Sequence, residues 1–296
     1  MKELKGIFIP AVTPFDKDQK VDFRAIWANL NQWNKTAVQG YMALGSNGEF
    51  RSLDDSESLQ ILQCFSESRD PDKILIAGVS RESLYQTLSF IDRLFTANIK
   101  LDYISVLPPH YFKTLMTDEA LFGYYTSIAN RSPYPVLLYC APNFSNGVCL
   151  STALVQKLAE HPNIYGIKDT SSHMMNAYIG AVGGSKNFTI MAGSIKNLMS
   201  CLQQGGTGGV LSAANYFPQE CVELYRSFQE ENYSIAQEKY ENLSRLIKLT
   251  GGRGGIAGVK CCMNLLGLQG GIPRLPILPV KKEIEDEIKK VLAERE

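Results

Sequence analysis

The amino-acid sequence predicts an α/β fold, a closed (β/α)8 or TIM barrel with additional C-terminal helices. Short apolar runs recur along the first three quarters of the chain, amphipathic stretches separate them, and only helical patterns follow residue 217. Apolar strands joined by helices imply a parallel sheet covered by helices, and eight such units favour closure into a barrel. The length of 296 residues fits one large barrel as well as two ordinary domains, so length alone does not decide.

Eight short apolar runs are the expected strands of the barrel. They cover residues 6–10, 40–45, 73–79, 103–107, 135–140, 164–168, 188–192 and 208–212. Between them, stretches such as residues 53–68 and 82–97 carry apolar side chains at helical spacing and begin near Ser or Asp, which cap helices. The regular alternation of strand and helix is what a single barrel requires.

The last part of the chain lacks the strand pattern. Four helices are expected there, at residues 219–230, 234–248, 256–266 and 281–293. The glycines at 251–255 and the segment 272–276 with its two prolines are expected to form turns, since both residue types break periodic structure. We therefore expect a barrel with the active site over residues 1–224 and a helical extension over residues 225–296.

Composition and charge indicate a globular protein that binds small molecules. Lys and Arg number 30, as do Asp and Glu, and no basic stretch marks a nucleic-acid binder. The seven cysteines form no Cys-x-x-Cys pair, which argues against a disulfide framework and favours a reducing cytoplasm. No apolar run is long enough for a signal core or a membrane span, so we expect a cytoplasmic protein without membrane contact.

Lys168 is the first candidate for a catalytic residue. It ends the apolar run 164–168, which reaches the C-terminal tip of an expected buried strand, the end of a barrel strand where chemistry is done. A lysine held away from water there loses its charge easily, and the neutral amine can attack a carbonyl. The sequence therefore predicts a nucleophile that forms a Schiff base.

Tyr139 is the candidate for the proton transfers that a Schiff base requires. It lies near the end of the expected strand 135–140, so strand alternation can direct its phenol into the barrel mouth beside Lys168. The alternative is a core tyrosine whose hydroxyl is bound to a carbonyl. Both hypotheses stay open from the residues alone.

Two glycine-rich segments are candidates for anion binding. Residues 45–49, Gly-Ser-Asn-Gly-Glu, follow the second strand, and their backbone N–H groups can converge on a carboxylate. A plain strand-to-helix turn would look similar. Residues 205–209, Gly-Gly-Thr-Gly-Gly, either bind phosphate near the eighth strand or allow close backbone approach, and we favour close approach.

A metal site is not expected. The three histidines, His110, His161 and His173, are scattered and form no ligand-spaced pair. His110 follows the fourth strand and can lie near the barrel mouth, although a solvated loop residue is the safer interpretation.

Taken together, these segments resemble the family of pyruvate-dependent class I aldolases and synthases that includes dihydrodipicolinate synthase and N-acetylneuraminate lyase. The resemblance covers nearly the whole chain. It is carried by Ala-Val-Thr-Pro-Phe at 11–15, Gly-Ser-Asn-Gly-Glu at 45–49, Pro-Pro-His-Tyr at 108–111, Tyr-Cys-Ala-Pro at 139–142 and Gly-Ile-Lys-Asp at 166–169. The last two segments match the family's catalytic tyrosine and Schiff-base lysine strands.

The resemblance implies a homotetramer, a dimer of dimers, in which pyruvate condenses on the lysine and the enamine adds to an aldehyde, or the reverse. Lys168 would form the imine without any metal or organic cofactor, and Tyr139 would transfer protons. Ser46 would relay the proton, with Tyr111 completing the relay from a neighbouring subunit.

The resemblance also implies a substrate pocket. The backbone N–H groups of Ser46 and Asn47 would bind the pyruvate carboxylate, and the carbonyl of Leu211 would line the pocket.

The chain departs from the synthase pattern mainly where the second substrate binds. Synthases carry an arginine after the tyrosine strand, whereas residues 143–147 here read Asn-Phe-Ser-Asn-Gly. Losing that charge-assisted contact makes the usual semialdehyde substrate doubtful. Ser46-Asn47 in place of Thr-Thr, and Ala-Gly-Ser at 192–194, look more like 4-hydroxy-2-oxoglutarate aldolase.

We therefore rank such an aldolase above 4-hydroxy-tetrahydrodipicolinate synthase. A catalytically idle barrel that binds a keto acid is the alternative outside the enzymes.

Overall fold

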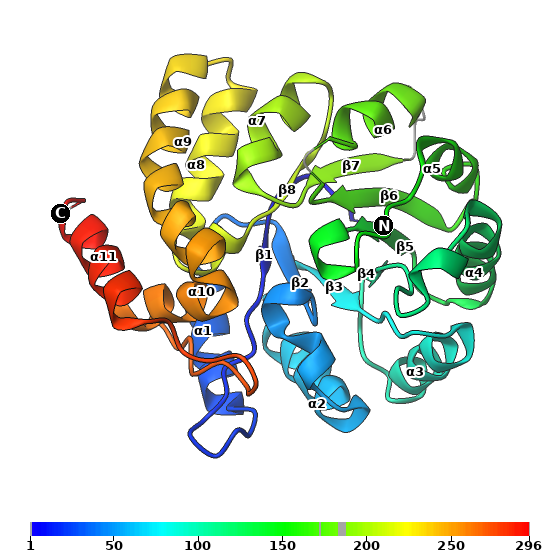
Figure 1. The fold of residues 1–296 in the computed structure, drawn as a ribbon, viewed down its shortest axis with the longest axis horizontal. Coiled ribbons are helices and arrows are strands. Elements are labelled where there is room, and N and C mark those ends of the chain that lie inside the picture. The colour runs from blue at the N-terminus through cyan, green and yellow to red at the C-terminus, as the bar shows by residue number, and fades with distance from the viewer. Residues whose placement is uncertain (1, 172, 183–187, 296) are drawn as a thin grey trace. The chain divides into compact units, whose positions relative to one another are not determined.

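The computed structural model describes residues 2–171, 173–182 and 188–295 of the chain. Eight strands, β1 to β8, follow one another in sequence order as a closed barrel, and every strand pairing recorded between them is parallel (Figure 1). Helices α1 to α7 alternate with the strands, and α8 to α11 follow β8. This confirms the predicted fold class.

The chain divides into two compact units. The first joins the N-terminal residues up to Lys5 with Ile74–Val210, and the second joins Gly6–Lys73 with the chain from Leu211 onward. The proposed boundary between residues 224 and 225 stays a prediction.

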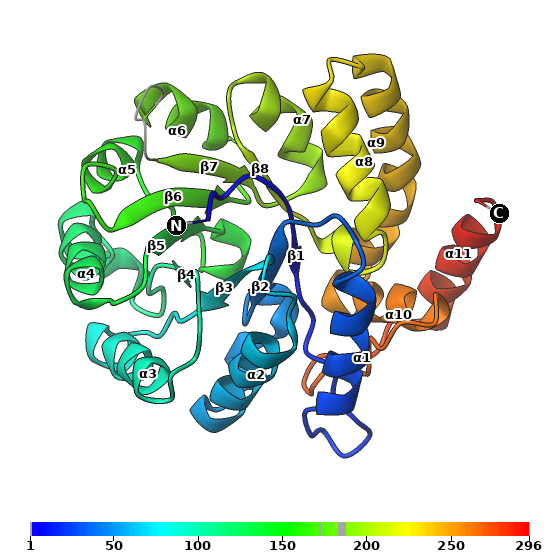
Figure 2. The same cartoon turned by 180° about the vertical axis from the view of Figure 1, so that it is seen from behind.

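In the residues that the structure describes, the first unit contains six strands and five α-helices. The strands are β3 (Ile74–Gly78), β4 (Tyr103–Val106), β5 (Val136–Cys140), β6 (Ile164–Asp169), β7 (Thr189–Ala192) and β8 (Gly208–Val210). The helices are α3 (Leu84–Thr96), α4 (Asp118–Arg131), α5 (Thr152–Leu158), α6 (Met175–Val182) and α7 (Ile195–Gln203). Figures 1 and 2 show α3 to α7 on the outer side of these strands. Most strand residues are buried, because helices cover a parallel sheet.

The helices of the first unit begin where the sequence places short polar side chains. Ser83, Thr117 and Ser151 cap α3, α4 and α5, and each accepts a hydrogen bond from a backbone N–H of the first turn. Such caps satisfy donors that the helix itself leaves without partners.

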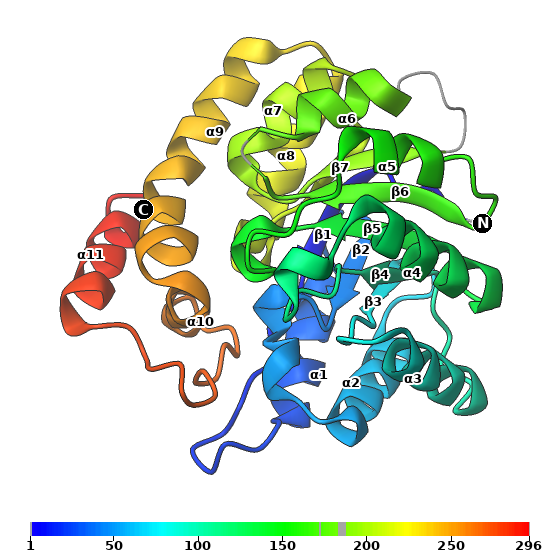
Figure 3. The same cartoon turned by 45° about the vertical axis from the view of Figure 1, so that its right-hand side comes forward.

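The described part of the second unit contains two strands and six α-helices. They are β1 (Gly6–Pro10), α1 (Phe23–Trp33), β2 (Gly40–Ala43), α2 (Asp55–Ser68), α8 (Pro218–Gln229), α9 (Tyr233–Ile247), α10 (Gly255–Leu265) and α11 (Lys282–Ala293). Asp54 and Glu57 form a complete capping box at the start of α2. Figure 3 shows the C-terminal helices, in which α8 packs on α9 and α11 contacts α9 and α10.

One expectation about the C-terminal helices is wrong. The glycines at 251–255 do not form a turn that breaks the helices, because residues Lys248–Arg253 continue from α9 as a π-helix. The Gly254 N–H donates to the Leu249 carbonyl at 2.8 Å, five residues back. A methyl group on Gly258 would lie 2.5 Å from the Thr250 carbonyl oxygen, so glycine here permits close approach of two helical segments.

Two findings bear on the chain's environment. All seven cysteines are free thiols in the structure. In the part of the chain that the structure describes, no helix combines the length and apolar character that crossing a bilayer needs.

Candidate active site

Lys168 lies in β6 with only 3% of its surface exposed. In register it stands between Tyr139 of β5 and Met191 of β7, residues whose side chains share its face of the sheet. Its Nζ atom lies 4.2 Å from the centre of the Tyr139 ring. The structure therefore brings together the two residues that the sequence selected as nucleophile and proton carrier.

Burial changes the chemistry of the Lys168 amine. Removal from water lowers its pKa from the ordinary value of 10.5 to about 7, because an ammonium ion loses its solvation there. At this pKa about half of the amine is uncharged at neutral pH, whereas an ordinary lysine is almost wholly protonated. An uncharged amine is the form that attacks a carbonyl carbon.

Residues after Lys168 hold the end of β6 in place. The buried Asp169 carboxylate accepts hydrogen bonds from the Ser171 hydroxyl at 2.7 Å and from its N–H at 3.0 Å. The Gly193 N–H donates to the Asp169 carbonyl at 2.6 Å. A methyl group on Gly193 would lie 2.1 Å from Thr170 Cγ2, so the two strand ends touch. This support was not predicted from the sequence, although an Asp side chain often binds the backbone N–H two residues further on.

The glycine-rich segment after β2 forms a tight turn in the second unit. Ser46–Gly48 is a 3-10 helix, and Glu49 ends it in the left-handed region with φ 51°. The first N–H groups of such a turn are not used by the turn's own carbonyls. The Asn47 side chain donates to the Ser212 hydroxyl at 2.8 Å.

Leu211, the other pocket residue implied by the resemblance, is fully buried directly after β8. Its N–H donates to the Phe8 carbonyl at 3.1 Å, and its own carbonyl accepts from Ala214 at 2.9 Å. Asn215, which the sequence analysis missed, fixes this segment by donating to the Pro10 carbonyl and accepting from the Val12 N–H.

Tyr111 behaves differently from Tyr139. It is 77% exposed, and its ring packs edge-on against Phe112, which is 63% exposed. Glu82 holds this loop, because its carboxylate accepts the N–H groups of His110 and Tyr111 and lies 3.4 Å from His110 Nδ1. His110 is therefore a partner of Glu82 rather than a freely solvated residue.

A cation lies on the loop after β5 despite the missing arginine. A methyl group on Gly147 would lie 3.0 Å from Nζ of Lys113, so the lysine amine rests directly against this glycine. Asn146 also donates to the His110 carbonyl at 3.4 Å, which joins the loops after β4 and β5. The sequence analysis missed Lys113 because it comes from a different loop.

The segment 205–209 fits close backbone approach rather than a phosphate loop. A methyl group on Gly206 would lie 2.2 Å from Cys201 Sγ and 2.8 Å from its carbonyl oxygen. Among the residues that the structure describes, no group of three or more His, Cys, Asp and Glu side chains could hold a metal ion.

The barrel, with a buried lysine of lowered pKa near the end of one strand, is typical of a class of enzymes, the class I lyases and aldolases. The family model of the dihydrodipicolinate synthetase family matches residues 3–295. An uncharacterized DapA-like lyase of Thermococcus kodakarensis is 30% identical over 300 residues, which cover 98% of this chain and 99% of that protein. A probable mitochondrial 4-hydroxy-2-oxoglutarate aldolase of Emericella nidulans is 28% identical over 293 residues, which cover 98% of this chain and 94% of that protein.

A solved structure agrees with these matches. YagE, a prophage protein of the dihydrodipicolinic acid synthase family from E. coli K12 in complex with pyruvate, is 25% identical, with a TM-score of 0.91 over 99% of both chains. The chain belongs to the dihydrodipicolinate synthetase family. Enzymes of this family are class I lyases and aldolases that use no external cofactor and form a Schiff base with pyruvate.

Proposed function

We propose that this protein is a pyruvate-dependent aldolase that cleaves 4-hydroxy-2-oxoglutarate, or a related 2-keto acid, through an imine on Lys168. The observation that carries the proposal is the buried Lys168 amine with its pKa near 7, in contact with the Tyr139 ring. An imine at C2 withdraws electrons from the C3–C4 bond, so that bond can break when the 4-hydroxyl loses its proton.

In this mechanism Lys168 forms the bond to the substrate and Tyr139 transfers the protons. The Lys168 amine attacks C2, and the Tyr139 hydroxyl gives its proton to the leaving hydroxyl, so that water departs and a protonated imine remains. The Tyr139 phenolate formed in this step takes the proton of the 4-hydroxyl as the C3–C4 bond breaks, and an aldehyde departs. Tyr139 then gives this proton to C3 of the enamine, and water releases pyruvate from the lysine. Ser46 and the exposed Tyr111, the latter from a second copy of the chain, would relay the protons.

The substrate carboxylates need two separate binding sites. The N–H groups of Ser46 and Asn47 are proposed to bind the carboxylate next to C2, with the Leu211 carbonyl lining the pocket. Lys113 is proposed to bind the distal carboxylate, since its amine rests on the loop that follows β5. A lysine amine binds a carboxylate as a point charge, without the paired geometry of an arginine.

The aldolase is preferred over 4-hydroxy-tetrahydrodipicolinate synthase because residues 143–147 hold no arginine. A homotetramer built from dimers and a cytoplasmic location stay predictions. The exposed side chains of Tyr111, Phe112 and Leu115 support burial of this face against a second copy, and the free thiols suit a reducing compartment.

Two reactions measured side by side test the substrate. We expect the purified protein to release pyruvate from 4-hydroxy-2-oxoglutarate with a kcat/KM about tenfold or more above that for condensing pyruvate with aspartate semialdehyde, because a lysine point charge does not replace the paired contact of the missing arginine. Pyruvate release and loss of the semialdehyde are followed in the same buffer. Efficient condensation would reverse the ranking, and bound pyruvate without either reaction would favour the idle barrel.

Lys113 gives a sharper test of the distal pocket. We expect Lys113→Met to lower kcat/KM for 4-hydroxy-2-oxoglutarate about tenfold, because the distal carboxylate loses a charged partner. Formation of the pyruvate imine should be unchanged, since pyruvate has no distal carboxylate. Lys157→Met, at an exposed lysine in α5, is the control for loss of one surface charge. An equal loss of kcat/KM in the two variants would show that Lys113 does not bind the distal carboxylate.

A further inference from the structure

The second unit contains a buried ion pair that the proposed mechanism does not use. Lys260 in α10 and Glu49 after β2 each have side chains only 1% exposed, and Lys260 Nζ lies 2.5 Å from Glu49 Oε1. The Lys260 amine also donates to the carbonyls of Thr13 at 2.7 Å and Ile272 at 2.8 Å. The Lys260 ammonium group therefore donates two hydrogen bonds to carbonyl oxygens and faces the Glu49 carboxylate as an ion pair.

Because of these contacts we do not expect Lys260 to act as a second nucleophile. Burial lowers its pKa to about 8, while the Glu49 charge acts in the opposite direction. A buried ion pair of this kind is weak support for stability, because desolvation of the two charges offsets their attraction. Stability alone therefore does not explain why these two charges are buried, and the backbone around Glu49 indicates another role.

Glu49 ends the glycine-rich turn in a backbone conformation that L-residues adopt rarely. Its φ is 51°, in the left-handed region, which is held only when the surroundings fix it. The Glu49 N–H donates to the Ser46 carbonyl, and its Oε2 accepts the Arg274 N–H at 2.9 Å. The preceding Gly48 carbonyl accepts the Thr13 hydroxyl at 2.7 Å. The side chain of Glu49 therefore anchors the C-terminal end of the turn that begins at Ser46.

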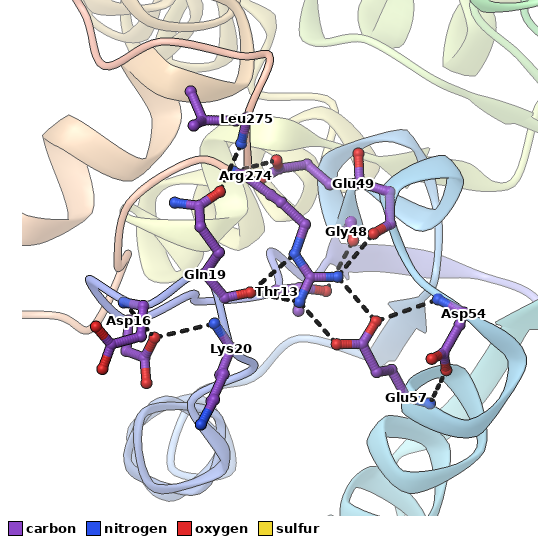
Figure 4. A network of polar contacts seen from close by, with 12 residues as sticks. Thr13, Asp16, Gln19, Lys20, Gly48, Glu49, Asp54, Glu57, Arg274 and Leu275 are labelled. Carbon is purple, nitrogen blue, oxygen red and sulfur yellow. Dashed lines mark hydrogen bonds and ion pairs between the residues drawn. The ribbon is translucent and has the colours of Figure 1, made fainter.

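Arg274 connects Glu49 to the start of α2. Its guanidinium donates to both carboxylate oxygens of Glu57, at 2.7 and 2.8 Å, and to the carbonyls of Gln19 and Ser52 (Figure 4). Glu57 belongs to the capping box of α2. The cations of Arg274 and Lys260 both lie over the Phe15 ring, at 4.2 and 4.5 Å from its centre.

We propose that Lys260 and Glu49 are positioning residues, which hold the turn at residues 46–48 in the backbone geometry that binds the carboxylate of the 2-keto acid. The proposal rests on the proposed function, in which the Ser46 and Asn47 N–H groups bind that carboxylate. Because the anchor fixes one end of a turn of three residues, releasing it redirects N–H groups at the other end. The effect is confined to substrates that carry a carboxylate.

A comparison of pyruvate with acetone distinguishes a positioning role of the Lys260–Glu49 pair from a role in the stability of the whole fold. The variant Glu49→Gln/Lys260→Met removes both buried charges together, so neither is left without its partner. Borohydride trapping on Lys168 is measured as a function of pyruvate and of acetone, which offers the same carbonyl without a carboxylate. We expect the half-saturating concentration of pyruvate to rise about tenfold or more, with trapping of acetone unchanged.

The control is a pair of the same chemistry that lies on the surface. Lys239 in α9 and Glu223 in α8 lie 2.7 Å apart, with side chains 31% and 40% exposed. The variant Glu223→Gln/Lys239→Met should leave trapping of both ketones unchanged. Should the buried double variant fail to fold, Glu49→Asp, which keeps the charge but shortens the side chain, is expected to show the same selective loss for pyruvate.

Two outcomes would overturn the proposal. Unchanged pyruvate trapping in the buried variants, or an equal loss with pyruvate and acetone, would leave the pair a purely structural role. Absence of any pyruvate adduct on Lys168 in the unmodified protein would instead overturn the proposed function and this inference with it. The unmodified protein therefore distinguishes the two failures.

Discussion

Lys168→Met is expected to abolish the covalent adduct with pyruvate and all aldol cleavage. Methionine fills nearly the same volume as lysine without an amine, so the core around β6 should stay packed. The replacement also removes a poorly solvated amine from the interior, and the melting temperature should stay equal or rise. Mass spectrometry after borohydride reduction in the presence of pyruvate measures the adduct, and peptide mapping assigns it.

The second buried lysine makes this prediction specific. Lys260 also has a lowered pKa, but its amine is bound to Glu49 and two carbonyl groups. We expect the adduct of the unmodified protein on Lys168 alone. An adduct that persists in Lys168→Met, or maps to Lys260, would contradict the assignment of the nucleophile.

The pH dependence of trapping follows from the same amine. Because burial lowers the Lys168 pKa to about 7, the neutral fraction falls about tenfold for each pH unit below that value and levels off above it. The rate of imine formation should therefore rise up to neutral pH and then become constant. A rate that keeps rising toward pH 9 or beyond would indicate an amine with the pKa of an ordinary, solvated lysine.

Much of this fold could be predicted from the sequence because its elements are strongly periodic. The strand at Gly6–Pro10 was predicted with its observed bounds, and the other strands differ only at their ends. The Gly251–Gly255 region was misjudged, because glycines end most helices but also permit two helical segments to touch. That contact depends on packing between Thr250 and Gly258, which no local pattern reveals.

Some residues of the candidate site could be predicted from the sequence, and others could not. Lys168 and Tyr139 could be selected because Lys168 ends an expected strand and Tyr139 lies near the end of another, and parallel register places strand ends side by side. Lys113, Lys260 and Arg274 could not, since each acts on a segment far from it in sequence. Glu49 entered the sequence prediction only as the last residue of the glycine-rich segment 45–49. Its proposed positioning role depends on its ion pair with Lys260, more than 200 positions away.

Tyr139→Phe is expected to slow turnover by about two to four orders of magnitude, the usual loss when a positioned proton carrier is removed. The ring remains, so its contact with the Lys168 amine at 4.2 Å and the packing of β5 should persist. Binding of pyruvate should change little, which separates a loss in kcat from a loss in KM. Steady-state release of pyruvate from 4-hydroxy-2-oxoglutarate measures both.

Tyr125→Phe in α4 tests the alternative, that Tyr139 is only a core tyrosine. Tyr125 is fully buried, and its hydroxyl donates to the Val106 carbonyl at 3.3 Å. Loss of this hydrogen bond should lower the free energy of unfolding by about 1 kcal/mol and leave the rate of aldol cleavage unchanged. If Tyr139→Phe behaved like Tyr125→Phe, with a lower melting temperature and a normal rate, its phenol would be structural. A large loss of rate at Tyr139 alone assigns the proton transfer to that hydroxyl, because both variants remove one buried oxygen and leave the aromatic ring in place.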